Sequence, residues 1–183
     1  MTWRNLLMFG LTLALAPAAD AAVTVLGGSH AQDCFEAAEA GKSDDSAMLS
    51  CDIALNTEAM APADRGGTLV NRGVMRLRRR EFGAAQADLD AGVALIPKVG
   101  ELWVNRGAMF IGLRRYREAL DDINKAISLG VHEPAKAYFN RGVAHEGLDD
   151  ETSAYLDYQQ ALVLHPGWDL PTKELLRFTV TRR

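Results

Sequence analysis

Few residues in this chain have the types and spacing that catalysis or metal binding needs. Its histidines are scattered, with no His-Glu-x-x-His motif and no cysteine at ligand spacing; they are His30, His132, His145 and His165. Neither cysteine has a histidine at the spacing of a nucleophilic pair. Gly-Lys-Ser at 41–43 resembles the end of a phosphate-binding loop, but Glu36 occupies the position of its required first glycine. The sequence therefore predicts no enzyme, no metal site, no cofactor and no small-molecule substrate.

The most informative polar residues belong to the tripeptide Asn-Arg-Gly, which occurs at 71–73, 105–107 and 140–142. Its glycines are 34 and 35 residues apart, and a period near 34 is typical of a helix–turn–helix array. Small and acidic residues recur in the same register: Ala85, Ala119 and Ala154 follow each glycine by twelve positions, and Asp88, Asp122 and Asp157 by fifteen. Each unit therefore needs two antiparallel helices, and their small residues let the two axes approach closely.

This pattern resembles the tetratricopeptide repeat (TPR) family. The large residue of that family stands four positions before each glycine, as Leu69, Trp103 and Tyr138, and the aromatic of its second helix matches Phe82 and Tyr116 but not Glu151. The resemblance covers roughly 66–166 and implies an all-α, right-handed superhelical solenoid of antiparallel helix pairs with a C-terminal capping helix. Its units are expected at 66–99, 100–134 and 135–167.

The flanks of these repeats are expected to extend the solenoid. A degenerate unit and linker would occupy 22–65, with helices near 28–41 and 47–55 and Pro62–Arg65 as extra connecting residues. The alignment places Cys34 and Cys51 on the two facing helices of this unit. Residues 168–183 would form the capping helix and a frayed tail, with Leu175, Leu176 and Phe178 packing inward.

The resemblance also implies a binding surface, because the first helices of such units line a concave groove. Asn71, Asn105 and Asn140 would then pair with the backbone of an extended ligand, since an amide offers both a donor and an acceptor. The apolar flanks would be Val70, Val74, Val104, Ala108, Phe139 and Val143. The alternative is that these asparagines serve repeat packing. Some family grooves clamp a terminal carboxylate with a lysine, but valine or phenylalanine fills that register here, so we expect an apolar ligand segment.

The charged residues of the repeats suggest internal pairing. Arg72 and Asp88 are 16 positions apart, as are their equivalents in the next two units, and a guanidinium suits bidentate pairing with a carboxylate. Further arginines gather after the first helices, at 76, 78–80, 114, 115 and 117. They form either a solvated edge or a basic surface for an acidic partner.

Residues 1–21 have the features of a cleavable signal peptide. Arg4 precedes an 11-residue apolar run at 6–16, and Ala-Asp-Ala at 19–21 fits the cleavage rule. The run is too short to span a bilayer, which takes about 20 residues; a buried N-terminal helix is the alternative. We therefore expect a periplasmic or secreted protein without an integral membrane segment after processing. Export favours a Cys34–Cys51 disulfide, about 3 kcal/mol for such a loop, over two buried thiols.

The net charge of the chain argues against one class of function, nucleic-acid binding. The chain has 183 residues, 24% of them charged, and a formal net charge of −4, whereas nucleic-acid-binding domains usually carry net positive charge. We expect an interaction module that binds a protein or peptide segment in its concave groove. The alternative is a structural subunit or assembly factor that docks through its edges or its C-terminal cap.

Overall fold

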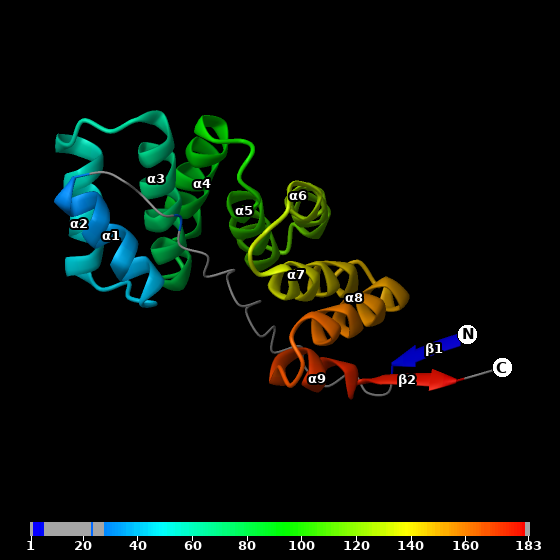
Figure 1. Ribbon diagram of the computed structural model, residues 1–183. Coiled ribbons are helices and arrows are strands. Elements are labelled where there is room, and N and C mark those ends of the chain that lie inside the picture. The colour runs from blue at the N-terminus through cyan, green and yellow to red at the C-terminus, as the bar shows by residue number, and fades with distance from the viewer. Residues whose placement is uncertain (1, 6–22, 24–27, 182–183) are drawn as a thin grey trace.

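The computed structural model describes residues 2–5, 23 and 28–181, and these contain nine helices arranged as a curved array (Figure 1). The helices come in antiparallel pairs, so the expected all-α solenoid is confirmed. Their bounds are α1 Ser29–Glu39, α2 Asp45–Thr57, α3 Pro62–Arg78, α4 Phe82–Leu95, α5 Gly100–Gly112, α6 Tyr116–Leu129, α7 Pro134–Glu146, α8 Glu151–Leu164 and α9 Asp169–Leu175.

The first helices of successive pairs line the inner side of the curve. Helix α3 contacts α5 and α5 contacts α7, while each pair also packs internally, as α3 with α4, α5 with α6 and α7 with α8. We call the surface formed by α3, α5 and α7 the inner face; α6 and α8 lie on the outer side in Figure 1. Stacking of this kind buries the apolar surface that one pair alone would leave in water.

In each of the three repeats, a glycine lets the two helices approach each other closely. A Cβ added to Gly107 would lie 2.6 Å from Cγ1 of Ile123 and 3.3 Å from the carbonyl oxygen of Ala119, both on the partner helix. At Gly142 it would lie 2.7 Å from Cε1 of Tyr158 and 3.3 Å from the carbonyl oxygen of Ala154. The glycines of the tripeptides therefore face the second helices, as the pattern predicted.

The turn within each unit needs one residue with a left-handed backbone. This residue is Arg80, Arg114 and Asp149 in the three repeats, with φ of 62°, 59° and 61°, and Gly41 takes the same role in the first pair with φ of 72°. Side chains other than glycine carry a cost of about 1–2 kcal/mol in this conformation. The tight turn of each repeat therefore costs some free energy of folding.

The first pair carries the disulfide. Cys34 and Cys51 are bonded, with their Cα atoms 4.8 Å apart, and both residues are fully buried. Asp44 caps α2 by accepting hydrogen bonds from the backbone N–H groups of Ser46 and Ala47. Pro62–Arg65, expected as connecting residues, instead form the first turn of α3, where proline is favoured because it has no N–H to leave unpaired.

The C-terminal end departs from the sequence-based expectation. Helix α9 ends at Leu175, and Leu176 is 82% exposed, so the expectation that Leu176 packs inward is wrong. Leu175 and Phe178 do pack against the C-terminal core. After α9, β2 (Phe178–Thr181) pairs antiparallel with β1 (Thr2–Asn5), so Thr181 lies in a strand and not in a frayed tail. The expected cleavage motif at 19–21 lies outside the described residues.

Candidate functional site

Asn71 on the inner face already binds a peptide backbone, namely that of Val23. The backbone N–H of Val23 donates to Oδ1 of Asn71 at 2.8 Å, and Nδ2 of Asn71 donates to the carbonyl oxygen of Val23 at 3.0 Å. The carboxamide is fully buried, and the half-buried valine side chain packs against the main core. One asparagine therefore satisfies both polar backbone groups of one residue, as a neighbouring strand would.

The equivalent asparagines, Asn105 and Asn140, lie at the same register of α5 and α7 and are also fully buried. Among the described residues, neither Oδ1 nor Nδ2 of Asn140 has a hydrogen-bond partner. A buried polar group left unpaired costs about 1–3 kcal/mol. The inner face thus repeats a group that can pair with a backbone, and at Asn140 that capacity is unused by the described residues.

The apolar residues predicted to flank the asparagines belong mainly to the core. Val70, Val74, Val104 and Ala108 are buried, and Val70 contacts α4 at the position of Gly92. Phe139 packs against Tyr158 and Trp168, with ring centroids 5.4 and 5.1 Å away. Val143 is half-buried. Of these six predicted flanks, it is therefore the one whose side chain is most open to a ligand.

The arginine of each tripeptide forms the expected pair with the aspartate 16 positions later. Arg106 donates through Nε and Nη2 to the two carboxylate oxygens of Asp122, at 2.7 and 2.9 Å, and the other two repeats have the same geometry. These hydrogen bonds raise the pKa of Arg106, while burial raises the pKa of the Asp122 carboxyl against the pull of the arginine. The pair holds the two helices of a unit together.

The same arginines also reach back to the preceding unit. Nη1 of Arg106 donates to Asp90 at 2.9 Å, that of Arg72 to Asp52 at 2.7 Å, and that of Arg141 to Asn124 at 3.0 Å. Each guanidinium therefore joins two second helices. These residues serve the scaffold and leave the asparagines as the polar groups with a binding capacity.

Three of the four arginines in the first cluster make contacts within the protein. Arg76 donates to Asp88 at 2.7 Å, Arg78 to the carbonyl oxygen of Ala38 at 3.2 Å, and Arg79 to Asp45 at 2.8 Å. The contacts of Arg78 and Arg79 join the first pair of helices to the next, while that of Arg76 joins α3 to α4. These three side chains therefore do not belong to the free basic surface that was one interpretation of the sequence.

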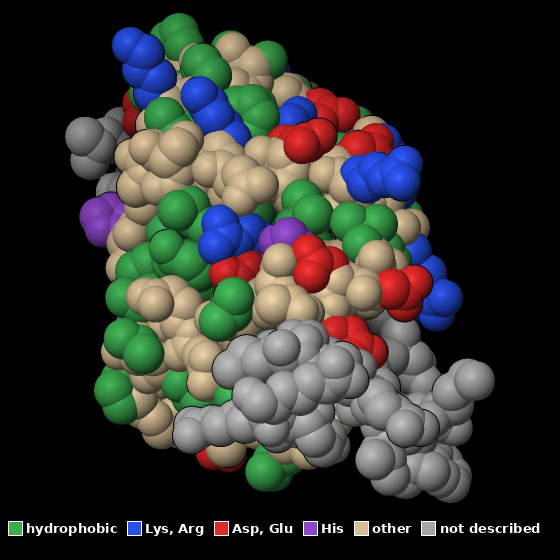
Figure 2. All heavy atoms as spheres, turned by 90° about the vertical axis from the view of Figure 1, so that its right-hand side faces the viewer, with side chains coloured by type: hydrophobic (Ala, Val, Ile, Leu, Met, Phe, Trp, Pro, Cys, Tyr) green, Lys and Arg blue, Asp and Glu red, His purple; other side chains and the backbone are tan. Residues whose placement is uncertain are grey.

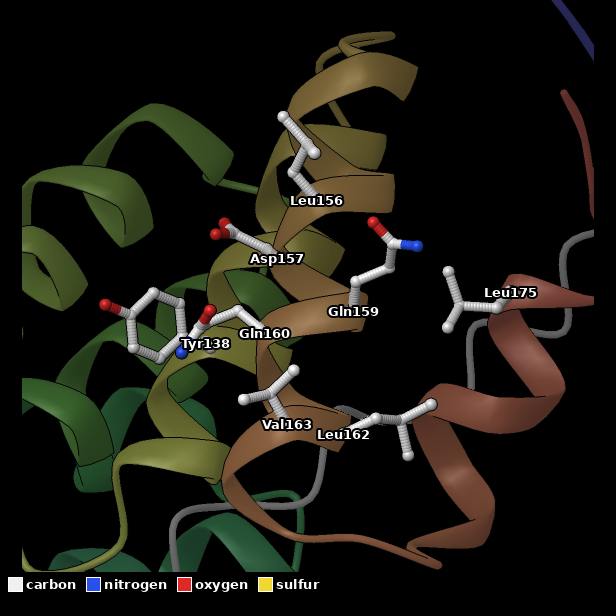
Figure 3. A pocket seen from close by; sticks show the side chains of 8 residues that line it. All are labelled: Tyr138, Leu156, Asp157, Gln159, Gln160, Leu162, Val163 and Leu175. Carbon is white, nitrogen blue, oxygen red and sulfur yellow. The ribbon is translucent and has the colours of Figure 1, made fainter.

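A second candidate surface lies on the outer side of the C-terminal end. Here an open pocket of about 670 Å³ runs along α8, with Tyr138 on one side and Leu175 on the other (Figure 3). Its lining includes Leu156, 56% exposed, and Val163, 71% exposed. Figure 2 faces this end of the molecule and shows hydrophobic side chains gathered on one side of it. Because α9 has only 7 residues, it covers α8 incompletely.

No group of three or more histidine, cysteine or acidic side chains that could hold a metal ion occurs among the described residues. His145 lies 3.4 Å from a carboxylate oxygen of Asp150, at the end of its own helix pair. Within the same part of the chain, none of the helices has the length and hydropathy needed to cross a membrane.

Sequence reasoning missed two features of this site. One is Val23, which lies 48 positions from Asn71 in a stretch without periodicity. The other is the backward contact of each arginine. The recurrence of a polar residue at Asp52, Asp90 and Asn124 was its only signal in the sequence.

Comparison with known sequences finds TPR proteins. The chain is 36% identical over 85 residues to the Hsp70-Hsp90 organizing protein of Triticum aestivum, and 39% identical over 77 residues to RNA polymerase II-associated protein 3 of Xenopus tropicalis. These matches cover 46% and 42% of this chain but only 14% and 11% of the two relatives. No protein-family model matches the chain.

Comparison with solved structures gives the same fold. The second TPR domain of human RPAP3, solved with HSP70 peptide SGPTIEEVD, is 26% identical with a TM-score of 0.59; the match covers 64% of this chain and 97% of that domain. MamA is 19% identical with a TM-score of 0.63, covering 79% of this chain and 81% of its own. The helix pairs, the glycine seams and the inner-face asparagines thus sit on a scaffold that is known to carry a bound peptide in another protein.

Proposed function

Because this chain is a tetratricopeptide-repeat protein, we propose that its inner face captures an extended protein segment through the three asparagines. The observation that carries the proposal is the two-way pairing of Asn71 with the backbone of Val23. An asparagine at the same register on each of three stacked helices can hold one strand at successive points. The proposed setting is the periplasm or the cell exterior, supported by the signal-peptide pattern at 1–21.

The expected ligand is an uncharged, extended segment bound along its backbone. Packed helix axes lie about 8–10 Å apart and an extended chain advances about 3.3 Å per residue, so neighbouring asparagines match positions about three residues apart. The peptide bound to the RPAP3 domain is acidic at its end, but here valine or phenylalanine stands at 70, 104 and 139. A ligand's apolar side chain can meet the half-buried Val143.

A selection from a displayed library of twelve-residue peptides tests the proposal. Peptides enriched on the full chain should lose binding when Asn71, Asn105 and Asn140 are all replaced by alanine, while far-ultraviolet circular dichroism stays unchanged. The matched control carries Leu156→Ser and Val163→Ser on the outer surface of α8, and it should retain binding. Binding that survives the triple substitution would refute a role for the inner face.

The second candidate function is docking of a protein through the outer surface of α8, as an assembly factor or structural subunit would. It is favoured by the exposed leucine and valine of the 670 Å³ pocket, since apolar surface of this kind is typical of interaction sites. In the experiment above, this function predicts the reverse pattern: the serine variant loses binding and the triple asparagine variant keeps it.

A further inference from the structure

We propose that Val23 is a built-in ligand of the inner face, which an outside peptide must displace from Asn71. This inference rests on the proposed function and deepens it. Val23 presents what a captured peptide would present: one N–H, one carbonyl oxygen and an apolar side chain. Both polar groups are satisfied by the same buried carboxamide, at 2.8 and 3.0 Å.

Val23 is joined to α1 by a short connection. Only five residues separate Val23 from Ser29, where α1 begins, and α1 itself packs on α3, the helix that carries Asn71. The start of α1 is fixed in turn, because the carboxylate of Glu58 accepts hydrogen bonds from the backbone N–H groups of His30 and Ala31 at 2.9 and 3.3 Å. A tether this short gives an effective concentration in the millimolar range.

The contact between Asn71 and Val23 determines which class of ligand can compete with Val23. Asn71 recognises backbone groups and makes no use of a side-chain charge or a terminal carboxylate, so the competitor must be an internal, extended segment with a free N–H. Val23 also lies beyond the expected cleavage point after Ala21, so removal of the leader would leave this occupant in place. Asn140, whose side-chain amide has no hydrogen-bond partner among the described residues, can bind the same incoming strand first, before that strand replaces Val23.

Amide hydrogen exchange of the full chain, labelled at valine with ¹⁵N, tests the contact. The Val23 amide should exchange slowly, and Asn71→Ala should accelerate its exchange about tenfold, since one backbone hydrogen bond is worth up to about a factor of ten. Asn140→Ala is the matched control: the residue has the same type, register and burial, and its side chain makes no hydrogen bond to Val23. An unprotected Val23 amide, or equal acceleration by both substitutions, would overturn the proposal.

Displacement is tested by adding the unlabelled, capped peptide of residues 22–28 to the same labelled chain at millimolar concentration. Exchange at Val23 of the chain should accelerate, and the same peptide with N-methylvaline at its second position should be several-fold less effective, because it cannot donate to Asn71. Acceleration by both peptides alike, or by neither, would contradict the displacement step.

The two proposals fail separately. If Val23 is unprotected but the triple asparagine variant still loses the selected peptides, the built-in ligand is refuted and peptide capture stands. If Val23 is protected, but the 22–28 peptide does not displace it and no selected peptide depends on the asparagines, the internal contact stands and capture of outside ligands is refuted.

Discussion

Replacing Gly107 by alanine should loosen the seam between α5 and α6. The new Cβ would lie 2.6 Å from Cγ1 and 3.2 Å from Cδ1 of Ile123, and 3.3 Å from the carbonyl oxygen of Ala119. Contacts under 3.0 Å are essentially unknown for real Cβ atoms, so Ile123 must leave its rotamer or the helices must separate. Overpacking of this kind costs about 1–3 kcal/mol, and the better helix propensity of alanine returns up to about 1 kcal/mol. We expect a net loss of about 1–2 kcal/mol.

The control is Gly83→Ala in α4, an exposed glycine whose added Cβ would have no atom within 4 Å. At this position the higher helix propensity of alanine is not opposed by a clash, so the variant should be up to about 1 kcal/mol more stable than the wild type. Urea unfolding followed by far-ultraviolet circular dichroism measures both, with the midpoints compared at constant slope. A Gly107→Ala protein as stable as the Gly83→Ala protein would refute the close-approach reasoning.

A double-mutant cycle identifies the clashing partner. Ile123→Ala removes the atoms nearest to the new Cβ, so Gly107→Ala should cost about 1 kcal/mol less in that background than in the wild type. Strictly additive effects would mean that Ile123 is not the cause.

Three further predictions concern other contacts of the scaffold. Burial and the hydrogen bond to Glu146 raise the pKa of Tyr158, while an unfolded tyrosine titrates near pH 10. Stability should therefore be complete below about pH 10 and fall above it, and urea midpoints against pH should show a shallower decline for Tyr158→Phe; equal declines would contradict this. Arg141→Lys loses the bidentate contact and should cost about 1–3 kcal/mol in urea unfolding, whereas Arg117→Lys at an exposed site should change stability by less than about 0.5 kcal/mol. Reduction of Cys34–Cys51 should lower the free energy of unfolding by about 3 kcal/mol and add the mass of two hydrogens; an unchanged mass would show that the thiols were free.

Most of the fold could be predicted from the period of the sequence repeat. Glycines 34 and 35 residues apart can lie against their partner helices only in a regular stack, so the helix pairs and the arginine–aspartate pairs could be predicted from spacing. Leu176 could not, because the direction of a side chain after α9 depends on where a short helix stops. Pro62 was assigned to a linker from the repeat count, although proline also suits the first turn of a helix.

The candidate site was only half predictable. The register of Asn71, Asn105 and Asn140 follows from the repeat, but the partner of Asn71 does not. Val23 stands in a stretch with no periodic pattern, and its contact spans 48 positions. Phe139 shares its register with Val70, yet it packs on Trp168 of the C-terminal cap, because the last repeat has no following unit to bury that side.

The contacts that the arginines make with the preceding unit differ in strength along the array. The first two junctions are closed by ionic contacts, Arg72 with Asp52 and Arg106 with Asp90, whereas the third is closed by the neutral amide of Asn124. A charged acceptor binds a guanidinium more strongly than a neutral one does. The arginine contact should therefore contribute less to the junction between the second and third repeats than to the two junctions before it.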